Sequence, residues 1–216
     1  MYLFYHRKIR DPRVIVIIVY IVYSFCTDVL TKYLDENGLI TATFENTSFS
    51  LFTIVEFCSF SLFFYFTLLA FPLLRNIIIV IILMFVIFCV INLYFQFNRN
   101  DNLDTIPVTF QAIFIMSMCL VYFFEQIRTP NSLFIYSTSE FWIVTSILVY
   151  LAGTFFIFIY SSNLTKEEFF EYWSINYVFN TIKNILFGLA LFIEGRKHKQ
   201  RVNKDSLDYY SVIENP

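Results

Sequence analysis

Six apolar stretches, each long enough to cross a lipid bilayer, constrain this chain more than any other feature. A helix needs about 20 mostly apolar residues to cross about 30 Å of hydrocarbon. The stretches run over Val14–Thr31, Phe49–Leu73, Asn76–Phe95, Ile106–Phe124, Phe141–Tyr160 and Tyr172–Ile193. Their isoleucine-rich runs do not alternate with polar residues as the strands of a membrane barrel do. We therefore predict an all-α polytopic membrane protein, a bundle of about six transmembrane helices.

Composition excludes a water-soluble domain. Hydrophobic residues make up 58% of the 216 residues, and charged residues make up 15%. A soluble domain carries about 25% charged residues, so this chain lacks the polar surface to cover itself in water. The net charge of −2 gives no indication of nucleic-acid binding.

Basic residues orient the predicted bundle. Eleven lysines and arginines lie in the two tails and in the links after the second and fourth stretches, against three in the opposite links. Cytoplasmic segments carry an excess of Lys and Arg, so both termini are predicted to be cytoplasmic. The chain then divides into a basic N-terminal tail (1–13), a transmembrane domain (14–193) and a tail that is basic and then acidic (194–216).

The stretches contain no set of residues that fits haem, metal or nucleophilic chemistry. His6 and His198 lie in the tails, and the four cysteines are scattered singly over four stretches. These patterns exclude a haem held by paired intramembrane histidines and a histidine-based metal site within the bilayer. No Walker A, catalytic-serine or zinc-protease motif occurs. We predict no cofactor, no metal site, no catalytic residue and no enzymatic activity.

Polar residues inside the membrane form the candidate site. The sixth stretch carries Asn176, Asn180, Lys183 and Asn184 at spacings of i, i+4, i+7 and i+8, which is one helical stripe. Glu56 in the second stretch is the natural counter-charge for Lys183. At 1.5 Å per residue their depths differ by roughly 6 Å, which long side chains can bridge.

The other stretches add polar groups at related depths. Four lie on one stripe of the first stretch (Tyr20, Ser24, Thr27, Asp28), four on one stripe of the fifth (Ser146, Tyr150, Gly153, Thr154), and Asn92 and Gln111 lie in the outer halves of the third and fourth. The candidate ligand-binding or polar-core residues are Glu56, Lys183, Asn180, Asn176, Asn184, Gln111 and Asp28.

Two interpretations of this set remain open. In the first, it lines a water-accessible pocket that opens outward, with Glu56 and Lys183 at its floor, because ionisable residues inside a membrane are functional candidates by default. In the second, a dry Glu–Lys pair and asparagine hydrogen bonds hold the helices together. The scarcity of Gly favours the second, since close helix packing alone cannot hold the bundle.

Part of the chain also resembles a family. The relevant segments are Thr105–Gln111 leading into Tyr122–Glu125, Glu140–Val144 with Tyr150–Phe156, Asn176–Phe187, and Glu56 in its aromatic setting. They look like a pattern in small, uncharacterised multi-pass membrane proteins of Bacteroidetes, and the resemblance covers the second to sixth stretches. It implies a bacterial inner-membrane protein with a signalling role, and it assigns no catalytic residue.

Together these features predict a multi-pass protein of the bacterial inner (plasma) membrane that acts as a sensor or signalling accessory. A small transporter or channel subunit is the alternative. The partners expected are the lipid bilayer and either a membrane signalling protein or further copies of the chain, and no nucleic acid.

Overall fold

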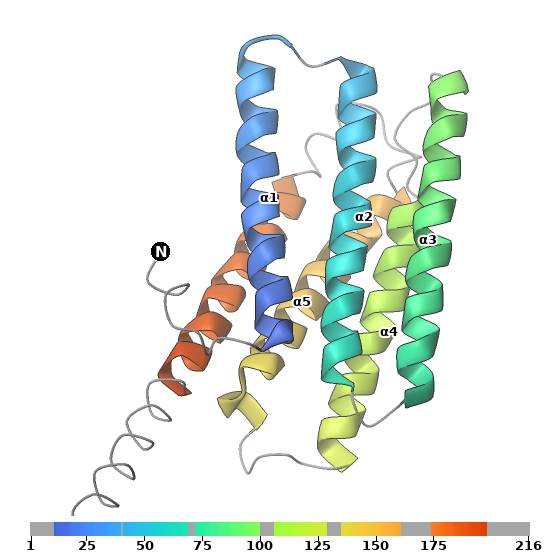
Figure 1. Cartoon of the computed structure of the whole chain (residues 1–216). Helices are drawn as coiled ribbons and strands as arrows, with labels where there is room; N and C mark the ends of the chain where they lie inside the picture. Colours follow the sequence, from blue (N-terminus) through green and yellow to red (C-terminus); the bar gives the residue numbers. More distant parts are fainter. Residues whose placement is uncertain are drawn as a thin grey trace, which may run out of the picture.

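The computed structural model describes residues 11–39, 41–68, 72–99, 106–128, 135–160 and 174–197 (Figure 1). Within them the helices are α1 (Pro12–Glu36), α2 (Ala42–Thr67), α3 (Pro72–Arg99), α4 (Ile106–Arg128), the short 3₁₀ helix η2 (Ile135–Ser137), α5 (Ser139–Tyr160) and a sixth long helix, Ser174–Lys197, called the 174–197 helix below. The six long helices are all long and apolar enough to cross a membrane. The predicted all-α membrane bundle is confirmed. Both histidines and most of the predicted tails lie outside the described residues.

Local sequence explains where the helices begin. Asp11 caps α1 by accepting a hydrogen bond from the backbone N–H of Arg13 (3.0 Å), and Pro12 occupies the first turn, where its missing N–H is no loss. Proline is also found at the start of α3, where one predicted boundary was wrong. The second stretch was expected to continue to Leu73, but α2 ends at Thr67 and α3 begins at Pro72.

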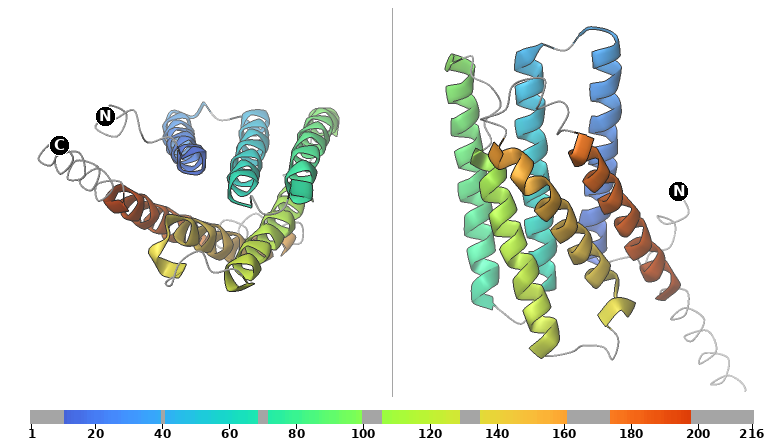
Figure 2. Two further views of the ribbon diagram at one scale, coloured as in Figure 1. Left: turned by 60° about the horizontal axis from the view of Figure 1, so that its bottom comes forward. Right: turned by 180° about the vertical axis from the view of Figure 1, so that it is seen from behind.

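The helices lie in two rows of three. In the left view of Figure 2, α1, α2 and α3 form one row, and the 174–197 helix, α5 and α4 form the other. Sequence neighbours pack within rows, α1 on α2, α2 on α3 and α4 on α5, while α2 and α3 both contact α4 across the rows.

Polar contacts place the start of α1 and the end of the 174–197 helix at the same end of the bundle. Arg13 forms an ion pair with Glu140 at the start of α5 (2.9 Å). The neighbouring Ser139 donates a hydrogen bond to Glu194 near the end of the 174–197 helix (2.8 Å). The start of α1 and the end of the 174–197 helix therefore lie on the same side, as an even number of crossings requires. The sequence predicts that this is the cytoplasmic side, and it is called the expected cytoplasmic end below.

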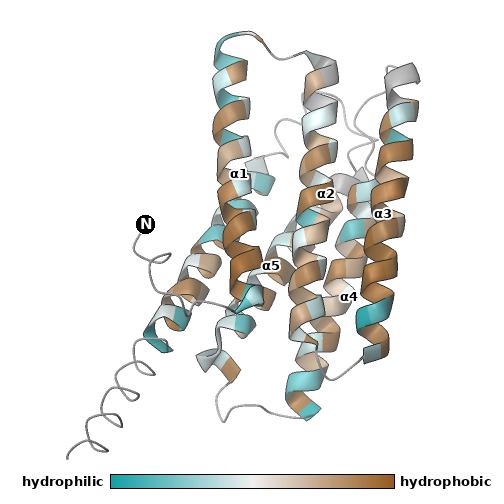
Figure 3. Cartoon of the chain, in the orientation of Figure 1, coloured by the Kyte–Doolittle hydropathy of each residue, from teal (hydrophilic) through white to brown (hydrophobic). Residues whose placement is uncertain are grey.

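Burial separates lipid-facing helices from the core. Only 17% of the most apolar part of α3 is buried, and Figure 3 shows this helix hydrophobic along most of its length. The sequence predicts that it faces lipid. The core between the rows is rich in aromatic rings, for example where the ring of Phe60 packs on that of Tyr20 with centroids 4.8 Å apart. This apolar packing surrounds the polar residues described next.

Candidate functional site

Four side chains from four helices form one hydrogen-bonded chain in the core. Lys183 Nζ donates to the Tyr20 hydroxyl oxygen (2.7 Å), and that hydroxyl donates to Glu56 Oε1 (2.5 Å). Glu56 Oε2 accepts a hydrogen bond from Gln111 Nε2 (2.7 Å). We call these four residues, Lys183, Tyr20, Glu56 and Gln111, the buried polar chain. It links α1 and α2 of one row to α4 and the 174–197 helix of the other.

The Lys183 ammonium is surrounded by protein groups. Besides the Tyr20 bond, Nζ lies 3.6 Å from Glu56 Oε1 and 3.9 Å from the centre of the Tyr150 ring. A desolvated cation over an aromatic face gains about 2 kcal/mol or more. Lys183 is 0% exposed and Glu56 is 4% exposed, so the charges compensate each other almost entirely without solvent.

A further bond fixes the backbone of the 174–197 helix beside this cation. The buried Ser146 hydroxyl of α5 donates to the main-chain carbonyl oxygen of Lys183 (2.9 Å). Ser146 and Tyr150 are four positions apart and therefore lie on one face of α5. That face meets Lys183 through both its backbone and its ammonium group, which holds α5 and the 174–197 helix together.

Helical spacing explains why α1 supplies the tyrosine. Ile17, Tyr20 and Ser24 recur at i, i+3 and i+7 and are all buried, so they form the inward stripe of α1. A buried tyrosine hydroxyl needs a hydrogen-bond partner, and the carboxylate of Glu56 provides one. The apolar ring packs on Phe60 and Phe187 while the hydroxyl joins the two charges.

The structure brings three of the seven predicted site residues into direct contact. Glu56 and Lys183 form the expected pair, and Gln111 adds the amide hydrogen bond. Asn176 and Asn180 are half-buried on the same helix as Lys183, and the Oδ1 atom of each lacks a hydrogen-bond partner among the described residues. In this conformation Glu56 and Lys183 do not line an open pocket, since almost none of their surface is exposed.

Two predicted residues take no part in the hydrogen bonds of the buried polar chain, although the Asp28 carboxylate lies close enough to interact electrostatically with Lys183. Asn184 is exposed, because neighbouring positions on a helix point about 100° apart and Lys183 takes the inward direction. Asp28 is also exposed, two turns along α1 from Tyr20. The polar stripes expected on α1 and the 174–197 helix therefore extend beyond the core onto the outside of the bundle.

Tyr20, Tyr150 and Ser146 were recognised in the sequence only as members of polar stripes. Tyr20 bridges the two charges, the Tyr150 ring lies beneath the ammonium group, and Ser146 bonds the Lys183 carbonyl oxygen. These roles depend on contacts between segments far apart in the sequence, for example 163 positions between Lys183 and Tyr20. The available signal was that a tyrosine in an apolar helix, followed by polar residues at i+4 and i+8, must place its hydroxyl near a partner.

The chemistry of this site is that of ion pairing and hydrogen bonding. No group of three or more metal-binding side chains occurs in the part of the chain that the structure describes. The buried polar chain contains one cation, one anion and two neutral groups that both donate to the anion. Such an arrangement stores two charges in a low-dielectric core and depends on all four members being in place.

No protein-family model matches the chain, and neither a curated protein nor a solved structure is significantly similar to it. The function is therefore argued from the buried polar chain and the helices that it connects.

Proposed function

We propose that this protein is a non-enzymatic sensor or signalling accessory of a bacterial inner membrane, in which the buried polar chain couples the two rows of helices. The observation that carries the proposal is the hydrogen-bonded path from Lys183 through Tyr20 and Glu56 to Gln111. Ionisable groups inside a membrane are expensive and usually functional. The resemblance of the second to sixth stretches to small Bacteroidetes membrane proteins supports the same role.

Such a chain suits a two-state element. Removing or neutralising one member of a buried ion pair leaves an uncompensated charge, which costs about 3–5 kcal/mol. A stimulus that protonates, solvates or binds one member therefore shifts the balance between a closed arrangement of the two rows and an open one. A ligand shifts such an equilibrium only through its different affinity for the two states.

The output runs along rigid helices to the expected cytoplasmic end. α1 and the 174–197 helix, which meet through Tyr20 and Lys183, meet again through α5 by the Arg13–Glu140 and Ser139–Glu194 contacts. A shift of one helix at the buried polar chain changes these polar contacts. The signal then passes to a partner by helix movement.

The input side follows the polar stripe of the 174–197 helix. Asn180 and Asn176 precede Lys183 by about one and two turns, toward the expected outer end. Both are half-buried with a carbonyl oxygen that lacks a hydrogen-bond partner among the described residues. Polar atoms in this state are ready to accept hydrogen bonds from water or from a small polar ligand.

The test is the accessibility of Asn180 from outside. Asn180→Cys, in a background with the four native cysteines replaced by alanine, is expected to react with a small charged thiol reagent, because that reagent requires water at the thiol. Phe179→Cys is the matched control, since the Phe179 ring packs against Gly153 on α5. Equal rates at the two positions contradict an outward-opening site and leave the polar stripe as packing.

A small transporter is the second candidate, because charged groups between two rows of helices also mark ion and proton pathways. Purified protein in liposomes with an imposed pH gradient and an internal pH-sensitive dye separates the two functions. The sensor proposal expects no flux beyond that of protein-free liposomes. A protein-dependent flux that is lost in Glu56→Gln contradicts the sensor and establishes transport.

A further inference from the structure

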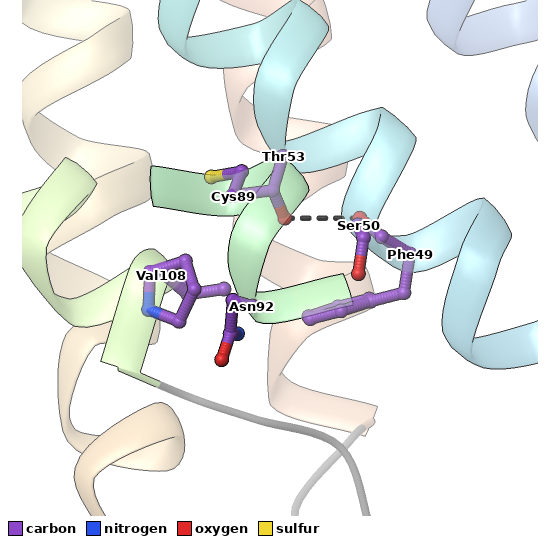
Figure 4. Close-up of a pocket in the computed structure, with 7 residues that line it drawn as sticks. Phe49, Ser50, Thr53, Cys89, Asn92 and Val108 are labelled. Carbon is purple, nitrogen blue, oxygen red and sulfur yellow. Dashed lines mark hydrogen bonds between the residues drawn. The ribbon is translucent and has the colours of Figure 1, made fainter. Parts of the chain in front are cut away.

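A small polar cavity lies between α2, α3 and α4. Figure 4 shows Phe49, Ser50 and Thr53 of α2 beside Cys89 and Asn92 of α3, and Pro107 and Val108 of α4 complete the lining. The Thr53 hydroxyl donates to the carbonyl oxygen of Phe49 (3.0 Å), which leaves its own oxygen lone pairs as acceptors toward the cavity. The cavity volume is about 10 Å³, roughly the space that one water molecule requires.

The cavity lies one helical turn from the buried polar chain. Glu56 follows Thr53 by three positions on α2, and Gln111 follows Val108 by three positions on α4. Residues three apart on a helix are neighbours on one face. The cavity therefore lies beside the Gln111–Glu56 end of the chain, on the side where α2 and α4 begin. The sequence predicts that this is the outer side.

The Gln111 carbonyl oxygen is a buried acceptor without a hydrogen-bond partner among the described residues. A carboxylate only accepts hydrogen bonds, so the amide nitrogen of Gln111 must face Glu56 and its Oε1 atom must face elsewhere. Gln111 is 1% exposed, and Oε1 lacks a hydrogen-bond partner among the described residues. Buried polar atoms are nearly always paired, and ordered water is the usual partner where the protein provides none.

We propose that the cavity holds a water molecule between the polar side chains that line it, Ser50, Thr53 and Asn92, and that it is the outer part of a hydrated port. Through this port water, and with it a proton, passes the unpaired Gln111 Oε1 one helical turn further in and reaches Glu56 from the expected outer side. Its hydration rests on the cavity and on Gln111 alone. Its role as the route of a stimulus deepens the proposed function and rests on it.

The groups around Glu56 leave this approach free of a competing charge. Oε1 is held by Tyr20 from α1 and faces Lys183 from the 174–197 helix, while Oε2 is held by the neutral Gln111 from α4. α3 contributes the neutral Asn92 to the cavity. Water in the port therefore reaches the carboxylate on the side of the neutral Gln111, and it does not have to displace Lys183.

Silver ion is a suitable probe, because it is a small cation that bonds thiols and travels through water. In right-side-out vesicles of a Cys26→Ala and Cys58→Ala protein, Ag⁺ is added outside, and each remaining thiol is counted by alkylation and mass spectrometry after denaturation. Cys89, which lines the cavity, is expected to react at least about tenfold faster than Cys119, which is 0% exposed deeper in α4. Asn92→Leu, which narrows the cavity, is expected to slow Cys89.

A second reporter tests whether the port reaches the buried polar chain. Gln111→Cys, with Cys89 replaced by alanine, is expected to react faster than Cys119 in the same molecule and to slow in Asn92→Leu. If Cys89 reacts no faster than Cys119, the cavity is dry and the proposal is wrong. If Cys89 is fast while Gln111→Cys is not, water stops short of Glu56 and the port is disproved.

These outcomes are independent of the Asn180 experiment. Slow labelling of Asn180→Cys with fast silver binding at Cys89 contradicts the input route along the 174–197 helix and leaves the port intact. The reverse result removes the port and leaves that route. Failure at both positions leaves the buried polar chain without contact to the outer solution.

Discussion

Tyr20 turns two separate charges into one unit. Lys183 Nζ and Glu56 Oε1 lie 3.6 Å apart, which is beyond a normal hydrogen bond. The Tyr20 hydroxyl lies between them, accepts a hydrogen bond from Nζ and donates one to Oε1. The position of both charged residues in apolar helices predicted their pairing. The polar residues at i+4 and i+8 from Tyr20 indicated that its hydroxyl has a partner, but they did not identify it as the bridge, because several tyrosines occur in the same stretches.

The pairing of Glu56 with Lys183 makes a thermodynamic cycle informative. We expect Glu56→Gln or Lys183→Met alone to lower stability in detergent, because each leaves one buried charge uncompensated at a cost of about 3–5 kcal/mol. Glu56→Gln with Lys183→Met is expected to recover much of the loss. Thermal unfolding of the four proteins measures the coupling, and additive effects contradict the pairing.

The bridging hydroxyl is expected to contribute on its own. Tyr20→Phe removes one hydrogen bond from each charge and is expected to destabilise the protein by about 1.5–3 kcal/mol, the range for hydrogen bonds to charged groups. Tyr23→Phe is the matched control, because Tyr23 lies one turn away on α1 with its ring stacked on Phe52. Similar losses in the two variants, measured by thermal unfolding, contradict a special role for Tyr20.

At the level of helices, hydrophobic length predicted the elements well and their ends less well. All six stretches correspond to helices, since the bilayer thickness sets their minimum length. The boundary at Leu73 was misplaced because apolar residues continue through the link and only Pro72 marks the change. Helical spacing correctly predicted that Lys183 faces the core. Asn184, which belongs to the same predicted stripe, is exposed, so the stripe is wide enough to reach the outside of the bundle.

Contact between α5 and the 174–197 helix depends on a glycine. A Cβ atom at Gly153 would overlap the Phe179 ring, whereas one at Gly188 would meet nothing within 4 Å. We expect Gly153→Ala to destabilise the protein by about 1–3 kcal/mol through overpacking. Gly188→Ala is the control, expected to be neutral or slightly stabilising because alanine favours a helix. A Gly153→Ala protein as stable as Gly188→Ala in thermal unfolding shows that the ring moves aside freely.

For the whole molecule, the number and order of helices were predictable, while their arrangement in two rows was not. Rows depend on which apolar faces meet, and the runs of isoleucine, valine and phenylalanine make those faces nearly equivalent in sequence. The polar contacts that bridge the rows reduce this ambiguity, since each buried charge must reach its partner.

The orientation in the membrane rests on the excess of basic residues. Reporter fusions at Gly38, Asn102 and Asn163 are expected to lie outside, and a fusion at the C-terminus is expected to lie inside, because eleven lysines and arginines oppose three. A reporter active only on one side of the membrane reads each position. A C-terminal fusion found outside contradicts the six-span orientation.

The central claim is that the buried polar chain couples the two rows, and distances across the rows test it most directly. Spin labels at Leu73→Cys on α3 and Gly195→Cys on the 174–197 helix, in a cysteine-free background, report both rows near the expected cytoplasmic end. Both positions are exposed. Ser117→Ala is the control, because this exposed serine donates its hydrogen bond within its own helix, to the carbonyl oxygen of Ile113.

We expect Glu56→Gln to shift the main spin-label distance by at least about 1–2 Å, the scale of helix shifts in switching proteins, while Ser117→Ala leaves it unchanged. An identical distance distribution in the parent, Glu56→Gln and Ser117→Ala proteins contradicts the coupling and reduces the buried polar chain to a static link between helices.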